Sequence, residues 1–187
     1  MKETCSKIRE NYQFYKNMID KEKHLNTLFI HLEDSSNKNW KEKVIPLHHN
    51  TLESIEFVAS KKNNDPKYGL KIFIRELYEK PVFYFDSDGP SHNNHDGKTR
   101  LSNTRVKTPH INYFDEFGVK KAERNEFIEQ NEDKLQIDIN FGMKFFCSHS
   151  NINKFVEIPE ILTEIQQKIE SKNIDLHDGV NFFINND

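Results

Sequence analysis

Two short polar runs of this chain contain the residue types that acid–base chemistry needs. Residues 86–97 include His92 and His95 among Asp, Asn and Gly, and residues 108–113 include His110. Histidine donates or accepts a proton near neutral pH, which makes it a frequent general acid or base. Polar sites also tend to lie on turn-rich loops held by a sheet. These two runs are therefore the candidate functional region.

Strand-like sequence comes directly before the first run and carries the second one. Residues 81–86 and 109–114 both favour strands. Because successive side chains of a strand point to opposite faces, alternate residues share a face. If the two strands pair, we expect four side chains to converge at one end of the sheet: Asp86, His92, His110 and Asn112.

The same residues also have a purely structural interpretation. Asp88-Gly-Pro and His95-Asp-Gly are strong turn sequences, in which Gly supplies positive φ, Pro fixes φ and Asp accepts backbone hydrogen bonds. A long loop with exposed histidines of no role is thus the alternative to a functional cluster. A metal site is a third interpretation, but the spacing His92-x-x-His95 lacks further ligands. We expect no metal and no cofactor.

Basic residues fall between the two histidine runs, within ten positions: Lys98, Arg100, Arg105 and Lys107. They predict either a local patch that holds phosphate groups or a solvated loop. The whole chain has a net charge of -3 and a pI near 6.3. Its global charge therefore gives no support for non-specific nucleic-acid binding.

Hydrophobic spacing predicts helices at both ends of the chain. Apolar residues recur every three or four positions over residues 2–33, without Gly or Pro. Residues 132–148 favour a helix more than a strand. Pro159 suits the first turn of a further helix that runs to about Ser171. The tail, residues 173–187, is expected to add a short strand or to dock in a groove.

Between these helices the sequence predicts a series of strands. Residues 54–59, 70–75, 81–86 and 109–114 are the clearest, and residues 44–47 suit an edge strand because they contain Pro46. The second and third should form a hairpin, and residues 87–107 a long loop. The predicted fold is α+β, an antiparallel sheet of four to five strands flanked by N-terminal and C-terminal helices.

We expect one domain over residues 1–187. It would consist of a helical N-terminal extension (1–40), a core (44–152), and a C-terminal helix and tail (153–187). The first five residues have no apolar stretch typical of a signal peptide, and no apolar run is long enough to span a bilayer. Cys5 and Cys147 lack metal-ligand spacing, so reduced thiols and a cytoplasmic location are expected.

The two polar runs resemble an uncharacterised family of small bacterial and phage proteins. The family pattern is a strand ending in Asp-Gly-Pro-x-His, a His-or-Asn-Pro-Asp-Gly turn, and then Pro-His-x-His-x-Tyr. Residues 145–152, Phe-Phe-Cys-Ser-His-Ser-Asn-Ile, are similar to its closing helix and Cys-Asn-Ile-like end. The resemblance covers residues 44–152. A shorter version of the layout is similar to TumE-type toxins of bacterial toxin–antitoxin pairs.

This resemblance implies a cytoplasmic protein of bacterial or phage conflict that acts on RNA. The chain departs from the family pattern at Asn112, where the pattern has a second His. Asn hydrogen-bonds a substrate but cannot carry a proton. The departure argues against efficient catalysis. It favours a protein that has kept the fold and a binding surface but has lost activity.

The leading hypothesis is a conflict-system protein that binds RNA, such as tRNA or mRNA. Whether it also cleaves the RNA, as a metal-independent ribonuclease toxin, is left open by Asn112. His92 and His110 are the predicted acid and base. RNA contacts are expected from Lys98, Arg100, Arg105, Lys107, Asn112 and Tyr113. A toxin of this kind would have a cognate antitoxin as its protein partner.

Two rival hypotheses involve no catalysis. One is a phage-encoded anti-defence protein, of the anti-CRISPR kind, that inhibits a host immune complex. The other is an immunity or antitoxin-like protein that binds only a protein partner. An acidic, aromatic-rich small chain suits both.

Overall fold

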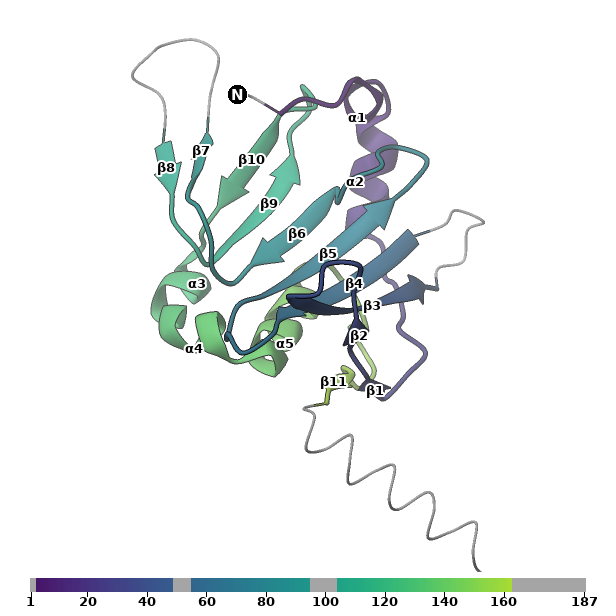
Figure 1. Cartoon of the computed structure of the whole chain (residues 1–187). Helices are drawn as coiled ribbons and strands as arrows, with labels where there is room; N and C mark the ends of the chain where they lie inside the picture. The colour runs from purple at the N-terminus through teal and green to yellow at the C-terminus, as the bar shows by residue number, and fades with distance from the viewer. Residues whose placement is uncertain (1–2, 49–54, 95–103, 163–187) are drawn as a thin grey trace, which may run out of the picture.

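The computed structural model describes residues 3–48, 55–94 and 104–162. They form an α+β fold built on a seven-stranded antiparallel sheet with the order β10-β9-β6-β5-β4-β3-β2 (Figure 1). The predicted fold class is confirmed, with more strands than predicted. The strands of this sheet are β2 (Glu33–Asp34), β3 (Trp40–Leu47), β4 (Ile55–Lys62), β5 (Tyr68–Ile74), β6 (Phe83–Asp86), β9 (His110–Phe114) and β10 (Lys120–Glu123).

The apolar pattern predicted the central strands of the sheet but not the strands at its two edges. The predicted hairpin is β5–β6, in which Leu70 pairs with Phe85. The strands β2 and β10 have the sequences Glu-Asp and Lys-Lys-Ala-Glu. Edge strands of this kind are short and charged because only one side of each is paired. Such sequences carry no alternating apolar signal, which explains the low predicted strand count.

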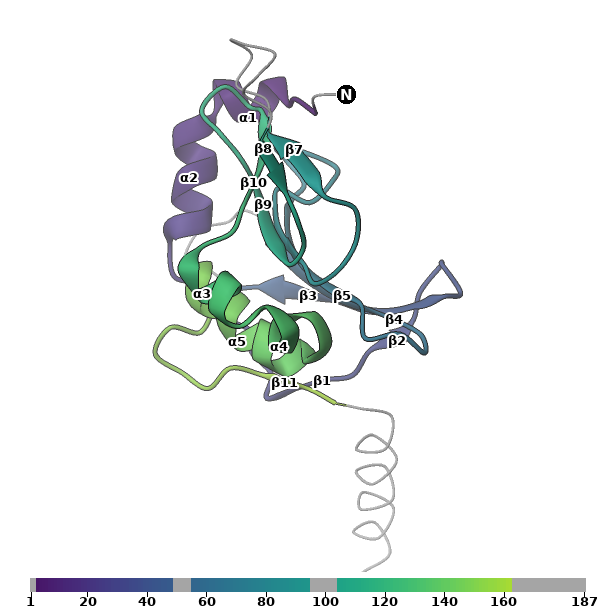
Figure 2. The same ribbon diagram turned by 90° about the vertical axis from the view of Figure 1, so that its left-hand side faces the viewer.

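The described helices lie together on one side of the sheet (Figure 2). They are α1 (Ser6–Glu10), α2 (Tyr12–Asp20), α3 (Glu126–Gln130), α4 (Glu132–Ile137) and α5 (Ile139–His149). The predicted helix 132–148 is two helices, because Asp138 is extended and its side chain accepts hydrogen bonds from the backbone of Asn140 and Phe141. This N-cap starts α5 anew.

The core fills the space between these helices and the sheet. Phe146 of α5 is fully buried, with ring centroids 6.1 Å from Phe57 and 5.6 Å from Phe83. Tyr68 is equally buried, and its hydroxyl donates to the carbonyl of Leu135 at 2.5 Å. Aromatic rings from the strands and α5 thus pack together within a core that also contains many aliphatic side chains.

The predicted helix over residues 2–33 is wrong beyond Asp20. Residues 21–34 are mostly extended and include β1 (Phe29–Ile30) and β2. The helix ends because the buried ammonium of Lys23 donates to the carbonyls of Met18 at 3.0 Å and Ile19 at 2.7 Å. Burial lowers the pKa of Lys23 to about 8. A lysine that caps the last carbonyls in this way replaces the next helical turn.

The predicted helix from Pro159 is wrong where the structure describes it. Residues Glu160–Ile161 form β11, which pairs in parallel with β1. The side chain of Asn140 accepts from the backbone N–H of Ile161 at 2.7 Å and donates to its carbonyl at 3.0 Å. These contacts hold the backbone extended. The remainder of the predicted helix and the tail lie outside the described residues.

The predicted long loop 87–107 contains a small hairpin of its own. Its strands are β7 (His92–Asn94) and β8 (Thr104–Val106). The side chain of Asn94 donates to the carbonyl of Ala122 at 2.7 Å and accepts from its N–H at 2.8 Å. This amide therefore pairs with the outer edge of β10 and fixes the hairpin beside the sheet (Figure 1).

No helix in the described ranges combines the length and the apolar character that crossing a membrane requires.

Candidate functional site

The two faces of the sheet differ in what covers them. The helices pack on one face, and no described helix covers the other, which we call the open face (Figure 2). Strand alternation puts one residue of each neighbouring pair on this face. At its β6–β9–β10 end these residues are Tyr84, Asp86, His110, Asn112 and Lys120.

Asp86, His110 and Asn112 form a polar cluster on the open face. In the β6–β9 pairing Asp86 lies directly opposite His110. The Nε2 atom of His110 is 3.8 Å from Oδ2 of Asp86, and the amide of Asn112 donates to the same oxygen at 3.1 Å. Asn112 thus holds the carboxyl in place, which is a positioning role that an amide performs without carrying a proton.

His110 and Asp86 differ sharply in accessibility. The side chain of His110 is 3% exposed, whereas that of Asp86 is 37% exposed. The alternative interpretation, in which the histidines are exposed and have no role, does not hold for His110. Its Nδ1 lies 3.2 Å from the carbonyl of Lys107, so both ring nitrogens face protein groups. Asp86 is the member of the pair that a ligand can reach.

Burial shifts both titrating groups toward their neutral forms. It raises the pKa of Asp86, against the attraction of His110 and the lysine charges. It lowers the pKa of His110, against the attraction of Asp86. Removal from water penalises a charged form more than these attractions favour it. A carboxyl with a raised pKa and a neighbouring imidazole is suited to proton transfer.

The β7–β8 hairpin brings a second histidine to this cluster. The ring of His92 packs edge-on against that of His110, with 6.5 Å between the centroids. This separation is within about two strand spacings, roughly 10 Å. The structure therefore brings together the four side chains whose convergence the strand pattern predicts: Asp86, His92, His110 and Asn112.

Three lysines that sequence reasoning missed surround Asp86. The charges of Lys71, Lys120 and Lys67 all act to lower its pKa. Lys71 lies across from Tyr84 in the β5–β6 pairing. The ammonium of Lys120 is 5.0 Å from the centre of the Tyr84 ring. Strand alternation in residues 70–75 would have placed Lys71 on the face of Asp86, but Lys120 belongs to an edge strand that the pattern did not predict.

Lys67 reaches the turn that follows Asp86. A Cβ atom added to Gly89 would lie 3.0 Å from the Lys67 ammonium, and Gly89 has a φ of +146°. The positive φ is what favours glycine at this position. The Asp-Gly-Pro turn thus has the structural role that its sequence predicts, and it also positions a cation beside the carboxyl.

The basic residues predicted to contact RNA do not share one environment. Lys107 pairs with Glu132 at 2.8 Å, and Arg105 is exposed on β8. Lys98 and Arg100 lie outside the described residues, as does His95. The structure therefore does not bring the predicted patch together at Asp86.

Tyr113 lies on the other face of the sheet. Its neighbours in β9, Asn112 and Phe114, alternate with it, and Tyr113 lines a hollow with Tyr15 and Phe83 beneath the helices. The expectation that Tyr113 and His110 serve one site is therefore not supported by their placement. The alternation that grouped His110 with Asn112 already contained this information.

Arg124 is the missed residue that holds the second polar run in place. Its guanidinium donates to the carbonyl of Pro109 at 2.8 Å and pairs with Glu132 at 2.6 Å. The side chain is 8% exposed. Arg124 therefore fixes the backbone directly before His110. No sequence signal pointed to it, because its partners are distant along the chain.

Metal binding finds no support in the described part of the chain, where no three His, Cys, Asp or Glu side chains gather closely enough to hold an ion. Comparisons of the chain with protein-family models, with curated proteins and with solved structures gave no match.

Proposed function

We propose that the chain binds single-stranded RNA on the open face of its sheet. The observation that carries this proposal is a group of three lysines, Lys67, Lys71 and Lys120, whose charges act on a carboxyl that remains accessible. In the described part of the chain, Lys67 and Lys71 have no carboxylate partner in an ion pair. Cations without such partners on an uncovered sheet favour a phosphate backbone.

Aromatic side chains on the same face supply surfaces for stacking. Trp40, Phe73 and Tyr84 belong to β3, β5 and β6 and share the open face by alternation. All three are partly exposed. The guanidinium of Arg75 lies 4.1 Å from the centre of the Phe73 ring. Bases of single-stranded RNA stack on aromatic rings and on guanidinium planes in this manner.

Cleavage of the bound RNA is the second part of the proposal. Metal-independent cleavage needs a base for the 2′-hydroxyl and an acid for the leaving oxygen. Asp86 and His92 are the partly exposed groups that can carry protons here. Buried His110 acts through Asp86 and is a positioning residue. This assignment suits a toxin-like ribonuclease of a bacterial or phage conflict system.

Fluorescence anisotropy with a labelled single-stranded RNA tests the binding. The double variant Lys67→Ala/Lys71→Ala should bind more weakly, and the slope of log affinity against log salt should flatten by about 0.7 for each lysine. Lys154→Ala is the matched control, since Lys154 is exposed and lies outside the open face. Wild-type protein that binds no RNA at low salt would exclude the proposal.

Cleavage is tested with the same RNA and with a 2′-O-methyl version of it. Because the attacking 2′-hydroxyl is blocked in the second substrate, only the first should be cut. Asp86→Asn should reduce cleavage about 10²- to 10⁴-fold, the usual effect of removing one acid–base group. Binding without cleavage by wild type would reduce the proposal to an RNA-binding protein.

A protein-binding inhibitor is the second candidate function, and one observation favours it. The ring of Phe127 is stacked on Phe145 with 5.2 Å between centroids, beside a cavity of about 410 Å³, and Phe127 is 42% exposed. Exposed aromatic clusters are typical of protein interfaces. An inhibitor would lose its effect in cells with Phe127→Ser and keep it with Lys67→Ala/Lys71→Ala. An RNA-binding toxin would keep its effect with Phe127→Ser and lose it with Lys67→Ala/Lys71→Ala.

A further inference from the structure

A second cavity lies on the helix side of the sheet, where β3 and β4 meet the start of α5. Its volume is about 400 Å³. Side chains from three separate segments give it an aliphatic lining: Leu32, Ile137, Ile139, Ile161 and Leu162. None of these residues belongs to the open face. We call this space the aliphatic cavity.

Hydrogen bonds fix the walls of the aliphatic cavity independently of any ligand. The side chain of Asn140 brackets the backbone of Ile161 on both sides, at 2.7 and 3.0 Å. The N–H of Leu162 donates to the carbonyl of Ile30 at 3.0 Å. A cavity whose walls are held in this way is preformed, as small-molecule sites usually are.

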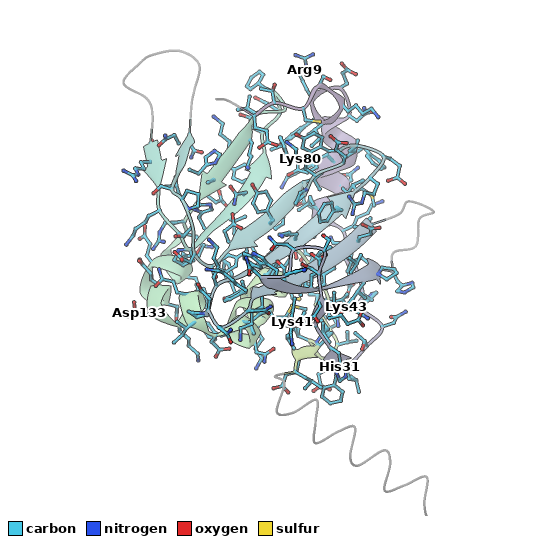
Figure 3. All side chains as sticks on the ribbon, viewed as in Figure 1. Arg9, His31, Lys41, Lys43, Lys80 and Asp133 are labelled. Carbon is cyan, nitrogen blue, oxygen red and sulfur yellow. The ribbon has the colours of Figure 1, made fainter. Side chains whose placement is uncertain are left out.

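The mouth of the aliphatic cavity is basic. Lys41 and Lys61 both line it, and they lie directly opposite each other in the β3–β4 pairing. Two lysines on neighbouring strands thus contribute positive charge to this end of the cavity. Lys62 is already paired with Asp65 at 2.7 Å. Lys43, which Figure 3 labels near Lys41, is paired with Glu33. Lys61 forms no ion pair with another described residue.

We propose that the aliphatic cavity binds an aliphatic carboxylate, with its chain against the isoleucines and its carboxylate at Lys61. The apolar lining and the cationic mouth are complementary to the two ends of such a molecule. A volume of about 400 Å³ is at the low end for ligand sites, so the ligand has a short or medium chain. This site is independent of the RNA proposal, since its aliphatic lining and Lys61 lie on the helix side of the sheet.

Calorimetric titration of the full chain with decanoate, below its micelle-forming concentration, tests the proposal. Decanol is the matched ligand without a charge and should bind more weakly. Lys61→Gln should weaken decanoate binding about fivefold, as expected for one partly exposed ion pair, and leave decanol binding unchanged. Lys154→Gln, which removes an exposed lysine outside the cavity, should change neither.

A second variant tests the apolar part of the site. Ile137 is 63% exposed, so Ile137→Asn should fold normally while weakening both decanoate and decanol. Equal binding of the two ligands, or decanoate binding that Lys61→Gln leaves intact, would overturn the proposal. Absence of any binding would also overturn it.

Discussion

The two faces of the central sheet of this protein are built from alternate residues of the same strands. One face is buried in the core, and the other carries the partly exposed residues of the candidate site. On the helix side, Phe83 and Phe85 of β6 are buried against α5. On the open side, Tyr84 and Asp86 of the same strand remain partly exposed. A single strand thus contributes to the core and to the candidate site within four residues.

This contrast indicates how the fold separates stability from function. The helix face gains free energy by removing aromatic rings from water. The open face keeps a carboxyl whose pKa burial raises, next to a histidine whose pKa burial lowers. Both shifts mean that the charged forms cost stability, which is a common property of functional sites. The contrast predicts large stability effects on one face and small ones on the other.

The largest loss of stability is expected from Phe146→Ala on the helix face. Removal of this fully buried ring should lower the free energy of unfolding by about 3–5 kcal/mol, measured by chemical denaturation. Phe73→Ala, which removes a partly exposed ring from the open face, is the matched control and should cost far less. Similar losses for the two variants would show that the open face is covered in solution.

An intermediate loss is expected from His110→Ala. The imidazole is buried and contacts both Asp86 and the carbonyl of Lys107. Its removal takes one contact from each of these groups inside a buried site, which should cost about 1–3 kcal/mol of unfolding free energy. A change below about 0.5 kcal/mol, typical of an exposed side chain, would contradict the burial of His110.

Asp86→Asn should not lower the free energy of unfolding at neutral pH, in contrast to His110→Ala. Because burial raises the pKa of Asp86 above its ordinary value of 3.8, the folded state holds the proton more tightly than the unfolded state. Its contribution to stability is therefore fully present below about pH 4 and is lost as pH rises through the folded pKa. Asn keeps an acceptor for Asn112 without the charge, so the variant should be at least as stable as wild type at neutral pH.

A pH series of unfolding measurements checks this sign. The stability difference between Asp86→Asn and wild type should be smallest in acid and should grow in favour of the variant toward neutral pH. A variant that instead becomes relatively less stable as pH rises would show that the carboxylate is stabilised by His110 and the lysines more than burial penalises it.

The smallest stability effect is expected from Lys71→Ala on the open face. With no carboxylate partner in an ion pair among the described residues, the Lys71 ammonium can be removed within about 0.5 kcal/mol of unfolding free energy. RNA binding, in contrast, should weaken and show a flatter salt dependence. A large stability loss with unchanged RNA affinity would assign Lys71 to the fold instead of the site.

The strand pattern predicted which side chains share a face, because that depends only on alternation within each strand. It grouped His110 with Asn112 before the pairing was known. The helix prediction failed at residues 21–33, where a buried lysine and long-range backbone contacts override the local apolar spacing. Propensity is a weak prior when such contacts compete with it.

The sequence by itself determined the α+β fold class, the central strands and the residue types available near Asp86. Only the tertiary structure decided that β6 pairs with β9, that His110 is buried behind Asp86, and that Lys67 and Lys120 lie beside the carboxyl. These facts depend on contacts between residues distant in sequence. Local pattern fixes the face on which a side chain lies, but burial and charge depend on what the rest of the chain packs against it.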